Sequence, residues 1–108
     1  MLLDLPVPLG DYFAAANVHD ADRVAACFAE NAVVHDEGRD RQGRDSIRAW
    51  ADETGRKYRH TAQVLAVETS PERAVVAARV AGEFPGSPIE LRYRFALAGG
   101  KIVGLKIS

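Results

Sequence analysis

The chain has 108 residues, 47% of them hydrophobic and 27% charged, which predicts one globular domain over residues 1–108 with a single core. Its formal net charge of −1 at pH 7 offers no attraction to nucleic acid or to an anionic membrane surface, so we expect neither as a partner. No apolar run approaches the ~20 residues that cross a membrane, and the first residues lack the basic region of a secretory signal; we therefore expect a soluble cytoplasmic protein.

Amphipathic patterns predict three helices in the first half of the chain. The first two cover Asp11–Val18 and Asp20–Ala29, and Asp20 is the expected cap of the second. Asp45 or Ser46 is the expected cap of a third helix, which should stop at Gly55 because glycine commonly ends a helix.

Alternating apolar and polar residues predict five strands. The alternation is strongest in the fourth, where every second residue from Ile89 to Leu97 is apolar and the residues between include Arg92 and Arg94. The polar segment Glu37–Arg44 is expected to be a loop. The predicted strands are Ala32–Asp36, Tyr58–Glu68, Ala74–Phe84, Ile89–Leu97 and Lys101–Ile107.

The order of these elements indicates the fold class. Helices gathered toward one end and strands toward the other predict an α+β domain. We expect a cone-shaped fold, in which three N-terminal helices pack on a strongly curved mixed β-sheet and enclose a pocket. Asp36 would lie at the wall of that pocket, since alternation places it on the same strand face as Ala32 and Val34.

Cysteine and histidine give no indication of a metal centre. Cys27 is the only cysteine, so no internal disulfide can form, and we expect a buried, inert thiol. The three histidines, His19, His35 and His60, lack the spacing of metal ligands. We expect no metal and no other cofactor.

Several segments resemble the nuclear transport factor two-like superfamily, which includes ketosteroid isomerases and SnoaL-like polyketide cyclases. They are Tyr12–Asp20, Cys27–Val34, and Gly43 with Ile47 and Trp50. The resemblance covers nearly the whole chain and implies the cone-shaped fold. Laid on the isomerases, it implies that Tyr12 is the oxyanion-hole tyrosine and Asp36 the general base. The isomerases' second oxyanion donor, an aspartic acid, matches Leu91, which cannot donate a hydrogen bond.

Three side chains are the predicted catalytic residues. Asp36 would be a poorly solvated carboxylate with a raised pKa, which suits a base near neutral pH; alternatively, it begins the loop and caps a backbone amide. Tyr12 would stabilise an oxyanion, or it is a core tyrosine. His60 would pair with Asp36 across the pocket mouth, or it lies on the surface.

The expected ligand is a hydrophobic small molecule. The residues expected around it are Val34, Trp50, Val80, Leu91 and Tyr93, and Tyr93 could supply the polar contact that Leu91 lacks. We expect a small-molecule pocket protein, an isomerase or cyclase that transfers a proton on an apolar carbonyl compound without a cofactor. The alternative is a non-catalytic module for ligand binding or dimerisation.

The outer face of the sheet is the expected dimer interface. The residues that point outward from Val75 to Glu83 are small or charged, as in many protein–protein contacts. We therefore expect a homodimer formed through this face.

Overall fold

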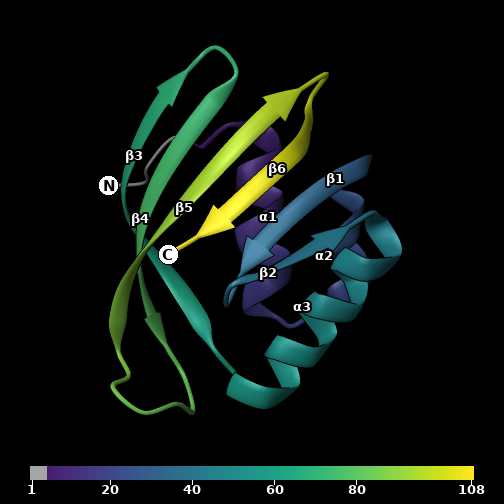
Figure 1. The fold of residues 1–108 in the computed structure, drawn as a ribbon. Helices are drawn as coiled ribbons and strands as arrows, with labels where there is room; N and C mark the ends of the chain where they lie inside the picture. The colour runs from purple at the N-terminus through teal and green to yellow at the C-terminus, as the bar shows by residue number, and fades with distance from the viewer. Residues whose placement is uncertain (1–4) are drawn as a thin grey trace.

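A computed structural model describes residues 5–108, which form an α+β domain of three helices packed on a six-stranded mixed sheet (Figure 1). This confirms the predicted fold class. The strand order is β2-β1-β6-β5-β4-β3, so the sheet is open, with β2 and β3 at its edges. The elements are α1 (Val7–Asn17), α2 (Ala21–Ala26), β1 (Phe28–Asp36), β2 (Arg39–Gln42), α3 (Arg44–Tyr58), β3 (Thr61–Ser70), β4 (Arg73–Ala81), β5 (Ile89–Ala98) and β6 (Lys101–Ile107).

The sheet is mixed because the first and last strands of the chain lie side by side. β1 and β6 run parallel, whereas the other neighbouring pairs are antiparallel. The three helices cover one face of the curved sheet, with α1 behind β6 and α3 beside β1 and β2 (Figure 1). None of the helices within residues 5–108 is long and apolar enough to cross a membrane.

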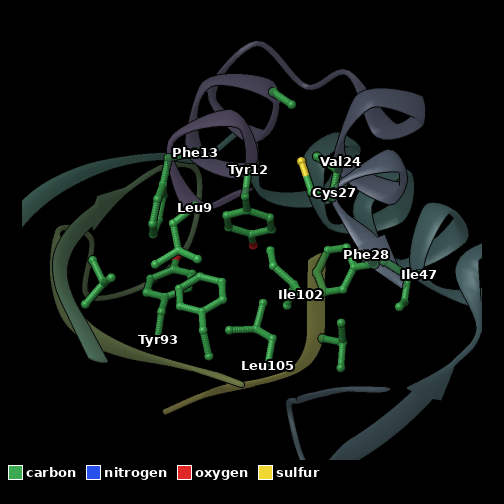
Figure 2. Close-up of a cluster of buried hydrophobic side chains, with 14 of the residues drawn as sticks. Leu9, Tyr12, Phe13, Val24, Cys27, Phe28, Ile47, Tyr93, Ile102 and Leu105 are labelled. Carbon is green, nitrogen blue, oxygen red and sulfur yellow. The ribbon is translucent and has the colours of Figure 1, made fainter. Parts of the chain in front are cut away.

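The core fills the space between α1 and the concave face of the sheet (Figure 2). Leu9 from α1, Phe28 from β1 and Ile102 from β6 are each 0% exposed. The alternation predicted for β5 is confirmed, since Tyr93 and Phe95 are buried while the arginines between and before them are exposed. Burial of such aromatic side chains is the main favourable contribution to a core of this size.

The first two helices differ from their predicted bounds. α1 already begins at Val7, with Pro8 in its first turn, where the fixed φ of proline suits a helix and its missing N–H breaks no helical hydrogen bond. Asp20 caps α2 as predicted, accepting a hydrogen bond from the Arg23 backbone N–H at 3.1 Å. However, α2 ends at Ala26, because Phe28 already pairs with Ile102 of β6.

α3 continues past Gly55 and ends at Tyr58, so the predicted stop is wrong. Gly55 is buried, and a Cβ atom there would lie 3.6 Å from the His19 ring. The turn after α1 therefore lies against α3 at this glycine, at an ordinary contact distance. The helix ends instead at Arg59, which adopts a left-handed conformation with φ 46°. Its N-terminal cap position is Gly43, not Asp45 or Ser46, and no side chain caps it.

The expected loop Glu37–Arg44 contains the edge strand β2. Glu37 and Gly38 both have positive φ, 55° and 72°, as in the two-residue turns that join antiparallel strands. β2 then pairs with the end of β1. Its sequence Arg-Asp-Arg-Gln is entirely polar, so it lacks the alternation of apolar and polar residues that predicts a strand. Charged residues are typical of edge strands.

Candidate functional site

A pocket of about 430 Å³ opens between the concave face of the sheet and one face of α3. Most of the predicted site residues line it, but Val34 does not: its side chain is 0% exposed and lies in the core. The lining residues are Tyr12, Asp36, Glu37, Trp50, Thr54, Tyr58, His60, Val80, Phe84, Pro85, Ile89, Leu91, Tyr93, Ile107 and Ser108.

Asp36 occupies the last position of β1, half-buried at the pocket wall. The indole Nε1–H of Trp50 donates a hydrogen bond to Asp36 Oδ2 at 3.0 Å. Burial raises the pKa of the Asp36 carboxyl, and the hydrogen bond from Trp50 partly opposes this rise. The carboxylate is therefore a stronger base than a carboxylate in water.

Two tyrosines from different elements line the same pocket. Tyr12 comes from α1 and Tyr93 from β5, and their ring centroids lie 6.3 Å apart. The Tyr12 hydroxyl points away from its helix toward the sheet (Figure 2). Burial raises the pKa of both hydroxyls, and the negative charge of Asp36 adds to the rise. Both therefore stay protonated at neutral pH and can donate hydrogen bonds.

Leu91 lies two residues before Tyr93 on the same face of β5 and also lines the pocket, half-buried. It provides apolar surface where the resemblance to the isomerases implies an acidic donor. Tyr93 is thus the nearest residue along this strand face that brings a hydrogen-bond donor to the pocket.

His60 lies between α3 and β3 and is half-buried, so it is not a surface residue. Within residues 5–108 no hydrogen bond joins it to Asp36, and its buried Nδ1 has no partner. Burial, followed by the nearby His19, lowers the pKa of His60, while the charge of Asp36 raises it. His60 therefore enters the pocket as a neutral ring and does not form the expected ion pair.

The position of His60 depends on the turn after α1. His19 Nε2 donates to the His60 backbone carbonyl at 2.8 Å. Asn17 makes two hydrogen bonds with the Ala62 backbone, Nδ2–H to the carbonyl at 2.9 Å and Oδ1 from the N–H at 2.8 Å. These contacts join segments more than 40 residues apart in the chain, and the sequence gives no signal for them.

The pocket mouth contains residues that the sequence analysis did not identify. The Tyr58 hydroxyl donates to Glu37 Oε2 at 2.8 Å, and the Tyr58 ring lies 5.9 Å from that of Phe84. Trp50, Thr54 and Tyr58 are spaced four residues apart and so share one face of α3. That spacing could have identified Thr54 and Tyr58 once Trp50 was assigned to the pocket.

The remaining polar side chains do not suggest a metal site. Among residues 5–108, no three or more His, Cys, Asp or Glu side chains are grouped so that they could hold a metal ion. Cys27 is buried as predicted, and burial raises the pKa of its thiol. His35 lies near Asp40 of β2, with Nδ1 at 2.5 Å from Oδ1, away from the pocket.

Comparison with known proteins identifies the family. The chain is similar to a candidate polyketide cyclase from Sinorhizobium meliloti, with 37% identity over 97% of this chain and 96% of that chain, and a TM-score of 0.93. A protein with a ketosteroid isomerase-like fold from Catenulispora acidiphila, solved in complex with trimethylamine, shares the fold at 16% identity, covering 97% and 86%, with a TM-score of 0.87. No curated protein matches the chain. The model of the SnoaL-like domain matches residues 9–105, and the chain therefore belongs to the SnoaL-like domain family.

Proposed function

We propose that the pocket binds a flat, apolar carbonyl compound and transfers a proton on it without a cofactor, as an isomerase or a cyclase does. The observation that carries this proposal is the half-buried carboxylate of Asp36 in a pocket that also contains two buried tyrosines. The similarity to a candidate polyketide cyclase at 37% identity supports the same class of chemistry.

In the proposed reaction, Asp36 removes a proton from the carbon next to the carbonyl group. The electron pair of the broken C–H bond moves to the carbonyl oxygen and forms an enolate. Tyr12 and Tyr93 donate hydrogen bonds to this oxygen, and in a site that excludes water such donors are worth about 2–4 kcal/mol each. In an isomerisation, the proton then returns from Asp36 to another carbon. In a cyclisation, the enolate carbon forms a bond to a second carbonyl carbon, the π electrons of that carbonyl move to its oxygen, and this oxygen takes the proton from Asp36.

A model substrate tests this chemistry while the natural one is unidentified. The probe 5-nitrobenzisoxazole is a flat ring that loses a C–H proton to a base, upon which its N–O bond breaks and a coloured phenolate forms. Since general-base catalysis contributes about 10²–10⁴-fold, Asp36→Asn should lower probe turnover by about 100-fold. Tyr12→Phe should lower it about tenfold or more.

The matched control is Asp52→Asn, the same substitution at an α3 carboxylate that pairs with Arg56 outside the pocket. It should leave turnover unchanged. If Asp36→Asn keeps the turnover of the unmodified protein, the assignment of the base is wrong. A different outcome would support the alternative function. If the unmodified protein binds the probe but converts it no faster than buffer alone does, the domain is a non-catalytic ligand-binding module.

We also infer a homodimer through the outer face of the sheet. Val75 and Ala77 of β4 point to this face and remain partly exposed, next to the exposed Arg92 and Arg94 of β5. Apolar surface of this kind beside charges fits a protein–protein contact.

A further inference from the structure

Trp50 makes a contact that its expected role as a pocket wall does not require. Its side chain is 5% exposed, and its indole N–H is the side-chain hydrogen-bond donor to Asp36 within the described part of the chain. The bond connects α3 to the end of β1, two elements that pack against each other. A donor on a buried aromatic ring has little freedom to move, so it restricts the rotation of the carboxylate that it holds.

The hydrogen bond from Trp50 also affects the ionisation of Asp36, together with the other groups around the carboxyl. The positive charge of Arg41 in β2 favours the ionised form of the Asp36 carboxyl. The neighbouring Glu37 acts in both directions: its negative charge disfavours the ionised form, and the hydrogen bond from its backbone N–H favours it. Tyr12, Tyr93 and His60 face Asp36 as neutral groups. Burial opposes ionisation more than any other factor, and the Trp50 hydrogen bond is the largest of the factors that favour it.

We propose that Trp50 is a positioning residue, whose indole N–H holds the Asp36 carboxylate in one orientation and keeps it ionised for proton transfer. The inference rests on the proposed function, because a positioned base has a purpose only if Asp36 accepts a proton. Trp50 itself does not exchange a proton with the substrate. Its loss should therefore change the ionisation of Asp36 and the turnover rate more than the binding of the probe.

The chain contains a single tryptophan, so one signal reports this contact in the unmodified protein. The indole N–H resonance in a proton–nitrogen NMR spectrum should move with pH as Asp36 ionises, with one midpoint. The same resonance in Asp36→Asn should show no such transition. A resonance in the unmodified protein that does not respond to pH would overturn the proposal.

The single tryptophan also allows a substitution that removes only the N–H group. Replacing tryptophan with β-(3-benzothienyl)alanine puts sulfur in place of N–H with nearly the same shape, so the fold is preserved, whereas Trp50→Phe would leave a cavity in its place. The Asp36 midpoint, measured by carboxyl NMR, should move to higher pH. Turnover of 5-nitrobenzisoxazole at pH 6 should fall about tenfold, the usual effect of losing a hydrogen bond to a charged group, while KM changes little.

The matched control is 5-fluorotryptophan, which retains the N–H group and should leave both the midpoint and turnover near those of the unmodified protein. If the benzothienyl variant loses thermal stability but keeps the Asp36 midpoint, Trp50 is structural only and the proposal fails. If the midpoint moves but the unmodified protein does not turn over the probe, the catalytic role of Asp36 is refuted, while the effect of Trp50 on ionisation stands. The two failures are therefore distinguishable.

Discussion

Gly82 occupies a position where a methyl group should disrupt both the fold and the pocket. It follows β4, where the chain leaves the sheet and passes the turn after α3. A Cβ atom at this position would lie 2.6 Å from the Tyr58 carbonyl oxygen and 2.9 Å from the Cα and Cβ of His60. Two of these three atoms belong to the backbone, so rotation of a side chain cannot relieve the contact. Gly82→Ala should therefore push the end of β4 away from Tyr58 and His60.

The cost follows from the atoms that must move. Overpacking in a well-packed site costs about 1–3 kcal/mol, and a rigid backbone neighbour favours the upper part of that range. The Glu83 N–H donates to the same Tyr58 carbonyl at 2.6 Å, and weakening that bond adds about 1 kcal/mol. The reduced freedom of the unfolded chain returns about 0.4–1 kcal/mol. The free energy of unfolding should fall by about 2–3 kcal/mol in total, which lowers Tm by about 10 °C in a domain of this size.

Urea unfolding of Gly82→Ala and Gly104→Ala, side by side, measures this effect. Gly104 of β6 is the matched control, because a Cβ atom there would lie 3.6 Å from the Ala96 Cβ, an ordinary contact. Gly104→Ala should change stability by about 0.5 kcal/mol or less. Gly82→Ala should also raise the KM for the probe, since Tyr58 and His60 line the pocket. Equal unfolding midpoints for the two variants would refute the reasoning.

Three further predictions concern charge, assembly and metal. Because the folded pKa of Asp36 lies above its unfolded value, the unfolded state ionises first as pH rises, and stability falls until the folded pKa is passed. Asp36→Asn should lack this fall, so urea unfolding should find it at least as stable as the unmodified protein at pH 7. If the stability of the variant relative to the unmodified protein is lower at pH 7 than at pH 3, the pKa of Asp36 is not raised by folding. Sedimentation at micromolar concentration should give about twice 11.7 kDa, whereas a monomer would exclude the dimer. Dialysis against a chelator should change neither Tm nor probe turnover, and a metal lost together with folding would show otherwise.

Local sequence patterns were sufficient for much of the sheet. In β5 the side chains alternate between the two faces, so apolar residues at every second position bury Tyr93 and Phe95 whatever the neighbouring strands are. The Asp20 cap of α2 is equally local, since its partner is the N–H three residues later. The placement of Asp36 on the inward face of β1 followed from the same period of two.

Local sequence patterns could not predict the features that depend on contacts with distant parts of the chain. β2 is a strand only because its backbone pairs with β1, and its polar side chains give no sign of this. Phe28 has the spacing of a buried helical residue but belongs to β1, because pairing with Ile102 outweighs helix propensity. α3 continues through Gly55, where the His19 ring from the distant turn after α1 lies against the helix, and a local pattern cannot indicate such a neighbour.

The candidate site divides in the same way. The sequence placed Asp36, Tyr12 and Trp50 on separate elements, each with an apolar face that had to be buried. It could not show that the indole N–H of Trp50 meets the Asp36 carboxylate, or that His60 enters the pocket without reaching that carboxylate. A hydrogen bond requires its atoms to lie within about 3 Å of each other in the right direction. That distance is set by how α3 and the turn after it pack on the sheet, which only the tertiary structure decides.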